Sequence, residues 1–256
     1  QGQGLNRAND PDLFFGQSLA AVELQLKKIV EADRRREGHL PPVLIEGETG
    51  AGKTAFARWL HRHGPRAQGP LIEVNCSALP EALAESELFG HERGAFTDAS
   101  ATRIGLMEAA EGGTLFLDEL PSLSPALQSK VLTAIEDHVI RRVGSNRMKP
   151  VNLRIIAATN ADLRNLVAAG RFREDLRQRL DLFRVQIPPL REHGEDIIAL
   201  AEQNKTSPEK MAKSLQERNA FQELAQEIII GKVLDFVELN AQVEEVATPS
   251  PSEVKA

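Results

Sequence analysis

The chain has 256 residues and has little of several features that would place it in particular protein classes. It contains one cysteine, Cys76, which excludes an intrachain disulfide and favours a reducing compartment. No apolar run approaches the roughly 18 residues of a membrane-spanning helix, and the first residues lack the basic and apolar regions of a secretory signal. A net charge of -6 argues against general binding to nucleic acid or membrane surfaces. We therefore expect a globular, cytoplasmic protein with no membrane partner.

What the sequence does contain is a series of short, continuously apolar runs separated by helical stretches. The runs are VLIEG (43–47), LIEVN (71–75), TLFLDE (114–119), LRIIAATN (153–160) and LFRVQIPP (182–189). Apolar residues at helical spacing also predict a helix over 17–36. Continuous rather than alternating runs are typical of a parallel sheet with both faces covered. The expected fold is a doubly wound α/β sheet that binds ligands at the carboxyl ends of its strands.

The two ends of the chain do not follow this pattern. Because the chain begins with Gln1 rather than Met, we expect a fragment of a longer protein, in which residues 1–13 are a polar lead-in. Residues 203–248 combine Lys and Glu with apolar positions at helical spacing, which predicts one or two amphipathic helices. Residues 249–256 are rich in Pro and Ser and are expected to be disordered.

Residues 47–54 read GETGAGKT and lie between a predicted buried strand and a predicted helix. This is the P-loop pattern in the context that it requires. The glycines let backbone N–H groups point at phosphate oxygens, at the positive end of the following helix. Lys53 can reach the β- and γ-phosphates, and Thr54 can place its hydroxyl on Mg²⁺. The pattern predicts that a nucleotide binds to Gly47, Glu48, Thr49, Gly50, Ala51, Gly52, Lys53 and Thr54.

Polar side chains also end two later apolar runs. Asp118 and Glu119 follow TLFL, and after a P-loop we interpret Asp118 as a residue of the Mg²⁺ site and Glu119 as the general base that polarises water. Taken alone, such a pair is better explained as a solvated turn. Thr159 and Asn160 end RIIAATN, where a polar group could hydrogen-bond the γ-phosphate or the water. An ordinary exit from a strand explains these two equally well.

Three arginines, Arg173, Arg177 and Arg179, lie in FREDLRQRL. Arginine is suited to neutralising a phosphoryl transition state, including one in a neighbouring subunit. A charged helix face with Glu174 and Asp175 as partners explains the same residues, and on the residues alone this explanation is the better one.

Taken in order, seven segments resemble the central AAA+ ATPase domain of bacterial sigma-54-dependent transcription activators. They are GETGAGKT, VNCSALPEALAESELFGHERGAFTDA, GGTLFLDEL, LQSKVLTAIED, RIIAATNADL, GRFREDLRQRL and PPLREHGEDI. The resemblance spans about residues 14–202 and implies an AAA+ P-loop fold in the bacterial cytoplasm. It also implies ATP with Mg²⁺, hydrolysis at subunit interfaces, and a homo-oligomeric ring, usually a hexamer.

The resemblance assigns roles to individual residues. Arg173 and Arg179 match the arginine fingers that reach the neighbour's ATP. Asn75 matches the residue that pairs with the Walker B glutamate, here Glu119, and controls it. Thr159 and Asn160 match the first sensor of these domains. Gly16 matches the stretch that lies against the adenine.

The segment GAFTDA matches the loop that contacts sigma-54 in this family and remodels the closed promoter complex of the RNA polymerase holoenzyme. It comprises Gly94, Ala95, Phe96, Thr97, Asp98 and Ala99, with Phe96 and Thr97 at the tip. The family pattern has glycine where this chain has Asp98. Asp tolerates positive φ less freely than Gly and adds a negative charge, so we hypothesise weakened or altered contact with sigma-54 and intact ATP binding.

The second departure is the helical lid of the family, which should follow residue 202 and carry a second sensor arginine. Its motif is absent, as is a helix-turn-helix, so we expect no direct DNA binding. Residues 209–246 instead resemble, weakly, the C-terminal end of the chaperone trigger factor; an amphipathic helix packed on the core is an equal explanation.

The principal function predicted is ATP hydrolysis that drives sigma-54 remodelling. The alternative is an ATP-binding regulatory or interaction module with weak or no hydrolysis and no sigma-54 remodelling, which Asp98 and the missing lid both favour.

Overall fold

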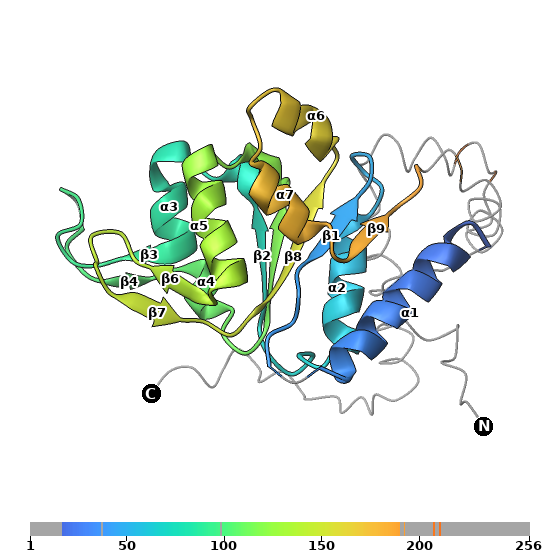
Figure 1. Ribbon diagram of the computed structural model, residues 1–256, viewed down its shortest axis with the longest axis horizontal. Coiled ribbons are helices and arrows are strands. Elements are labelled where there is room, and N and C mark those ends of the chain that lie inside the picture. Colours follow the sequence, from blue (N-terminus) through green and yellow to red (C-terminus); the bar gives the residue numbers. More distant parts are fainter. Residues whose placement is uncertain are drawn as a thin grey trace, which may run out of the picture.

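The computed structural model describes residues 17–36, 38–97 and 99–189, together with residues 192, 207 and 210. Within these ranges a central parallel sheet lies between two layers of helices, and two small hairpins lie at the end farthest from α1 (Figure 1). The predicted helix over 17–36 is confirmed as a short 3-10 turn, Gln17–Leu19, followed by α1, Ala20–Arg34. The helices expected over 203–248 lie outside the described residues.

All five apolar runs form strands of one sheet, as the sequence predicts. The strands are β1 (Val43–Glu46), β2 (Leu71–Asn75), β5 (Thr114–Asp118), β8 (Arg154–Thr159) and β9 (Arg184–Gln186). Their order is β2-β5-β8-β1-β9, and every neighbouring pair is parallel. Glu46 lies opposite Thr159 and Asn75 lies opposite Asp118. The polar residues that end the runs therefore meet at one end of the sheet.

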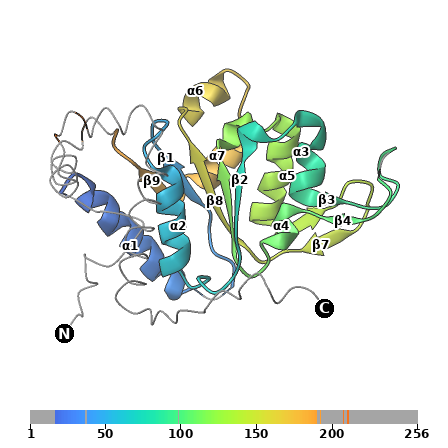
Figure 2. The same ribbon diagram turned by 180° about the vertical axis from the view of Figure 1, so that it is seen from behind.

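Helices cover both faces of this sheet, which explains why the strands lack polar alternation. Side chains point to opposite faces in turn. Leu115 and Leu117 belong to the core beneath α3, α5 and α7, whereas Phe116 belongs to the core beneath α1 and α2. Figures 1 and 2, which view the molecule from opposite sides, show these two sets of helices on either side of the strands.

Capping side chains and a proline fix where two of the helices begin. Besides α1 they are α2 (Lys53–His63), α3 (Glu81–Phe89), α4 (Leu106–Ala109), α5 (Pro125–Glu136), α6 (Leu163–Ala168) and α7 (Glu174–Leu180), with 3-10 turns at Cys76–Ala78 and Leu120–Ser122. The Ser124 hydroxyl accepts from the Leu127 N–H before α5, and Pro125 occupies the first turn, where its missing N–H costs nothing. Asp162 caps α6 in the same way by accepting from the Arg164 N–H at 2.8 Å.

Two antiparallel hairpins, which the sequence analysis does not predict, extend from the sheet. One pairs β3 (Gly90–His91) with β4 (Arg103–Ile104), and the other pairs β6 (Val139–Arg141) with β7 (Met148–Pro150). A bridge between His91 and Val143 joins them. Gly90, at φ 78°, and Gly105 approach each other so closely that a Cβ at Gly105 would lie 2.3 Å from the Gly90 nitrogen. Only glycine fits this crossing, which fixes the base of the loop 92–102.

A charged network holds the same base. Arg142, in the turn of the second hairpin, donates to Glu108 of α4 at 2.6 and 2.8 Å and to Glu92 at 3.0 Å. These hydrogen bonds raise the pKa of the Arg142 guanidinium and lower the pKa of the Glu108 carboxyl. The pKa of the Glu92 carboxyl is lowered chiefly by its hydrogen bond from Thr102 and then by that from Arg142. Thr102 also donates to Glu92 at 3.0 Å, so both ends of the loop 92–102 are held by side chains.

At the opposite end of the sheet, α1 is held by a buried ion pair. Arg154, the first residue of β8, donates to the Asp33 carboxylate at 2.9 Å, and both side chains are less than a tenth exposed. Burial raises the pKa of the Asp33 carboxyl, while the positive charge of Arg154 opposes that rise. Burial likewise lowers the pKa of the Arg154 guanidinium. Each charge is therefore tolerated in the interior because the other is present.

Candidate functional site

The P-loop, residues 47–54, connects the end of β1 to the start of α2. Gly50 and Gly52 adopt φ 83° and 82°, a region that residues with a Cβ rarely enter. Gly47 does not have a positive φ, but it packs closely against Ile187: a Cβ at Gly47 would lie 3.2 Å from the Ile187 side chain. The loop therefore curls tightly beneath the N-terminus of α2, where backbone N–H groups favour an anion.

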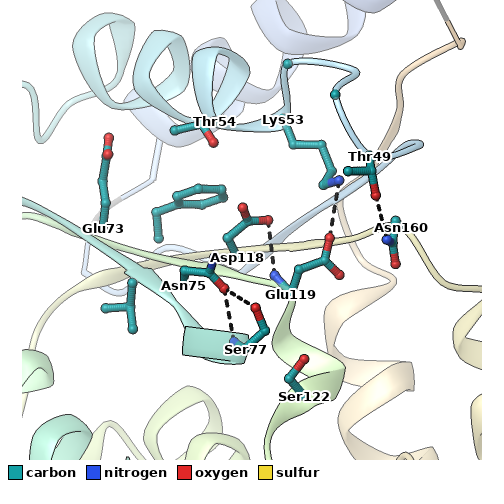
Figure 3. A pocket seen from close by; sticks show the side chains of 14 residues that line it. Thr49, Lys53, Thr54, Glu73, Asn75, Ser77, Asp118, Glu119, Ser122 and Asn160 are labelled. Carbon is teal, nitrogen blue, oxygen red and sulfur yellow. Dashed lines mark hydrogen bonds and ion pairs between the residues drawn. The ribbon is translucent and has the colours of Figure 1, made fainter. Parts of the chain in front are cut away.

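Lys53 is the first residue of α2, and its side chain turns back over the loop. Its Nζ donates to the carbonyl oxygens of Gly47 at 3.2 Å and Glu48 at 3.3 Å. It also lies 3.5 Å from Oε1 of Glu119 (Figure 3). Only 6% of the residue is exposed. A buried ammonium with these partners supplies a positive charge at the mouth of the anion-binding turn.

Asp118 and Glu119, at the end of β5, face this loop. Glu119 adopts φ 51° and ψ 47°, the left-handed conformation, which costs an L-residue about 1–2 kcal/mol. Its N–H donates to Oδ1 of Asp118 at 3.1 Å. Figure 3 shows Thr54 reaching from α2 and Asp118 from the sheet into the same cleft. The strained turn directs the Glu119 carboxylate towards Lys53 rather than along the strand.

Asn75 ends β2 directly opposite Asp118. Its Oδ1 accepts from the Ser77 N–H at 3.0 Å and from the Ser77 hydroxyl at 2.7 Å. In this structure, then, Asn75 caps the turn that follows it while Glu119 pairs with Lys53. The pairing of Asn75 with Glu119 stays a prediction, although the sheet brings both residues to the same cleft.

Thr159 and Asn160, at the end of β8, differ in position. Thr159 is 1% exposed, and its hydroxyl accepts from the Ala161 N–H at 3.0 Å, which supports the exit from the strand. Asn160 instead reaches the P-loop, where its Nδ2 donates to the Thr49 hydroxyl at 2.8 Å. Of the two, Asn160 lies where it can contact a phosphate or a water bound by the loop.

A cleft of about 830 Å³ is lined by Thr49, Gly50, Gly52, Lys53, Thr54, Asn75, Asp118, Glu119 and Asn160, whereas Thr159 is not part of the lining. The lining also includes Glu73, Ser77 and Ser122, which the sequence analysis does not select. Arg58 of α2 holds the Glu73 carboxylate with two hydrogen bonds of 2.7 and 2.8 Å. The signal for Glu73 was present, since a lone carboxylate interrupts the apolar run LIEVN.

Cys76 directly follows Asn75 at the end of β2 and is buried. Burial raises the pKa of its thiol to about 12, and the carboxylates of Asp118 and Glu119 add to the rise. The thiol is therefore protonated at neutral pH and packs as a small apolar group.

The three arginines of FREDLRQRL lie around α7, and none is among the described residues that line the cleft. Arg173 precedes α7, is 40% exposed, and binds the Asp175 carboxylate at 2.6 and 3.0 Å. Arg179 is 44% exposed and lies 3.8 Å from Glu136. Arg177 is less exposed and pairs with Glu174 and Asp181 of its own segment. Arg173 and Arg179 are thus exposed and lie outside the lining of the cleft of their own chain.

Phe96 lies in the loop between β3 and β4 and is 40% exposed. One edge of its ring meets the buried His91, with ring centroids 4.9 Å apart. The His91 Nδ1 lies 2.6 Å from the Ser86 hydroxyl of α3. Within the loop, the Gly94 N–H donates to the Ala99 carbonyl at 2.8 Å and the Ala99 N–H to the Phe96 carbonyl at 3.0 Å. The loop is thus closed on itself, with an aromatic ring half presented to solvent.

Two predicted site residues, Gly16 and Asp98, lie outside the described residues. Among the residues described, no three His, Cys, Asp or Glu side chains gather as metal ligands. No helix in the same part of the chain has the length and apolar character needed to cross a membrane.

Comparisons with known proteins relate this fold and cleft to transcription regulators. The family profile described as "Sigma-54 interaction domain" matches residues 19–186. The nitric oxide reductase transcription regulator NorR1 of Cupriavidus necator is 49% identical over 203 residues, covering 78% of this chain and 38% of that protein. The anaerobic nitric oxide reductase transcription regulator NorR of Escherichia coli strain SE11 is 53% identical over 177 residues, covering 69% and 34%. The chain therefore spans little more than a third of these relatives.

A solved structure agrees with the sequence relatives. NtrX from Brucella abortus, in complex with ATP, superposes with a TM-score of 0.63 at 31% sequence identity, covering 75% of this chain and 42% of that one. The likeness extends to a protein whose structure contains the nucleotide that the P-loop predicts.

Proposed function

We propose, from the premise that the chain belongs to the family of sigma-54 interaction domains, that it is the ATP-hydrolysing module of a sigma-54-dependent transcription activator. The observation that carries the proposal is the cleft at the carboxyl ends of β1, β5 and β8. There the lysine of the P-loop, two carboxylates and an amide from three separate strands lie within one cavity.

The residues of the cleft divide the chemistry among them. The P-loop N–H groups and Lys53 bind the phosphates, and Lys53 leaves its contact with Glu119 to do so. The Thr54 hydroxyl and the Asp118 carboxylate are oxygen donors of the kind that Mg²⁺ prefers, and they are the residues that would hold it. When bound there, Mg²⁺ would supply positive charge to the phosphate oxygens. Glu119, once released, orients a water and takes its proton, and Asn160 positions the γ-phosphate or that water.

The arginines complete this site from the neighbouring subunit. A transferring phosphoryl group carries negative charge that a guanidinium neutralises well. Arg173 and Arg179 are exposed and outside the cleft of their own chain, which supports action in trans within a ring. The hexameric form of that ring is part of the proposal.

The loop 92–102 would carry the motion to the polymerase. Phe96 is an exposed apolar side chain at its tip, and its base is held by Glu92, Arg142 and the crossing at Gly90. A rigid base and an apolar tip suit a surface that contacts a partner protein, proposed here to be sigma-54 in the RNA polymerase holoenzyme.

Arg173→Ala is expected to lower ATP turnover per subunit by roughly 30-fold, the equivalent of about 2 kcal/mol of transition-state stabilisation. Turnover of the unchanged protein should rise with protein concentration, because each site needs an arginine from another subunit. Steady-state phosphate release, measured against concentration, checks both points.

Arg177→Ala, within α7, is the matched control, since its side chain is 18% exposed, against 40% for Arg173, and pairs with Glu174 and Asp181. It should retain most of the turnover. Turnover that is independent of concentration and unaffected by Arg173→Ala would contradict action in trans. ATP binding without turnover at any concentration would favour the alternative, a regulatory module.

Phe96→Ala is expected to weaken binding of purified sigma-54 about tenfold in the presence of a non-hydrolysable ATP analogue, because it removes one aromatic ring from the interface. Fluorescence anisotropy of labelled sigma-54 measures the Kd. Met148→Ala is the control, since Met148 is also exposed, at 52%, but lies on β7 outside the loop. Equal losses in the two variants would count against the loop as the contact surface.

A further inference from the structure

Gln128 is a polar residue on the buried side of α5 and is 0% exposed. Burial of an unsatisfied amide is costly, so its hydrogen bonds identify what it stabilises. Neither the P-loop chemistry nor the loop 92–102 uses this residue. It lies where α5 packs beside α7, the helix that follows Arg173 (Figure 1).

All three hydrogen bonds of the Gln128 amide go to backbone groups of two other segments. Its Nε2 donates to the carbonyl oxygens of Leu123 at 2.8 Å and Arg171 at 3.1 Å. Its Oε1 accepts from the N–H of Arg173 at 2.9 Å. The side chain thus holds residues 171–173 from both sides, with its own position fixed by Leu123.

The Arg173 carbonyl accepts from the Arg177 N–H at 3.1 Å at the start of α7, whereas the Arg173 N–H has Gln128 as its partner. The N–H groups of Arg171 and Phe172 donate to the Leu166 carbonyl at 2.9 and 3.2 Å, which ends α6. Phe172 is buried, but the Arg173 side chain is bound only to the exposed Asp175 in the part of the chain described. The direction in which the Arg173 side chain extends from the surface is therefore set by the backbone that Gln128 holds.

We propose that Gln128 is a positioning residue for catalysis in trans: it fixes the backbone from which Arg173 reaches the ATP of the neighbouring subunit. The inference rests on the proposed function, because it needs Arg173 to act on that ATP. It goes beyond it by assigning a role to a buried amide that touches neither nucleotide nor partner. A displacement of a catalytic group by about 1 Å can lower the rate by a factor of about 100. A backbone contact that fixes Arg173 can therefore affect turnover without touching the reacting atoms.

The test replaces the amide without changing its length, in Gln128→Met, and compares it with Arg173→Ala. Thr133→Val is the matched control, since the Thr133 hydroxyl donates at 3.2 Å to Ser129 within α5 and not to 171–173. We expect Gln128→Met to lower turnover about tenfold with an unchanged Kd for ATP. Amide hydrogen exchange across 171–180 should be faster in this variant, and Thr133→Val should show neither effect.

Mixing subunits separates positioning from a loss of structure. Glu119→Gln subunits cannot hydrolyse ATP efficiently but carry an intact Arg173. Added to Gln128→Met subunits, they should restore turnover, because they supply a correctly held arginine to sites that are otherwise complete. Failure of this restoration would overturn the inference, since the defect would then lie in the variant's own cleft.

Two further outcomes distinguish a failure of the Gln128 inference from a failure of the proposed function. If Arg173→Ala lowers turnover and Gln128→Met does not, the inference alone is overturned. If Arg173→Ala itself has no effect, the proposed trans function fails and the inference with it. Should Gln128→Met not fold, Gln128→Asn replaces it, because its shorter side chain keeps an amide but withdraws it from residues 171–173. This variant should also show faster exchange across 171–180 and lower turnover; unchanged turnover despite faster exchange would overturn the inference.

Discussion

Lys53→Ala is expected to weaken ATP binding about 100-fold and to reduce turnover to background. The Lys53 ammonium is buried and lies among P-loop carbonyls, where a charge-assisted bond to phosphate has little competition from water. Losing such a bond, and leaving phosphate charge without its counter-charge, costs about 3 kcal/mol, which is roughly a factor of 100 in Kd. Isothermal titration calorimetry with ATP and Mg²⁺ measures that factor directly.

Lys130→Ala provides the matched control. Lys130 lies on α5 and pairs with Glu85 of α3, away from the residues that line the cleft. It should bind ATP as the unchanged protein does. If Lys53→Ala kept its affinity for ATP and unfolded at the same temperature as the unchanged protein, the P-loop would not be the phosphate site.

The ion pair between Lys53 and Glu119 gives this prediction a second consequence. A carboxylate and a phosphate compete for the same Lys53 ammonium, so phosphate binding and the release of Glu119 from Lys53 are linked. In Glu119→Gln, phosphates no longer compete with a carboxylate for Lys53. That variant should therefore bind ATP at least as tightly as the unchanged protein, in the opposite direction to Lys53→Ala.

The sheet and the P-loop could be predicted because their signals are local. Five continuous apolar runs predict five parallel strands, and the structure confirms all five. The carboxyl ends of parallel strands lie at the same edge of a sheet, so the sequence alone predicts that the polar residues that end the runs 114–119 and 153–160 lie close together. The P-loop glycines are recognisable because only their lack of a Cβ permits the turn.

The sequence does not predict contacts that join distant residues, nor short elements and turns that follow no periodic pattern. The strands β3 and β4 are two residues each, too short for any alternation to be recognised. The hydrogen bond that the Arg173 N–H donates to Gln128, and the ion pair of Lys53 with Glu119, depend on how the helices lie on the sheet. Asn75 likewise finds its partner, Ser77, through a turn whose geometry no periodic pattern encodes.

Arg154→Met is expected to lower the free energy of unfolding by about 3–5 kcal/mol at neutral pH, because it leaves the Asp33 carboxylate buried without its partner. Urea unfolding followed by circular dichroism measures the change. The double variant Asp33→Leu/Arg154→Met removes both charges and should recover most of the loss, since well-packed apolar residues often replace a buried pair without cost. Arg35→Ala is the surface control: its partner Glu31 is 64% exposed, and the unfolding midpoint should not change.

The pH dependence of that loss identifies the group responsible. Burial raises the pKa of the Asp33 carboxyl in the folded protein, and Arg154 is the main group opposing the rise, with Arg36 and Arg66 contributing less. Without Arg154 the folded pKa rises further above the unfolded value. A raised carboxyl pKa stabilises the folded state at low pH, and that stability disappears as pH rises through the folded pKa. The difference between Arg154→Met and the unchanged protein should therefore be smaller at pH 5 than at pH 8. A difference that is constant across this range would mean that lost packing of the arginine side chain, and not the unpaired Asp33 carboxylate, causes the destabilisation.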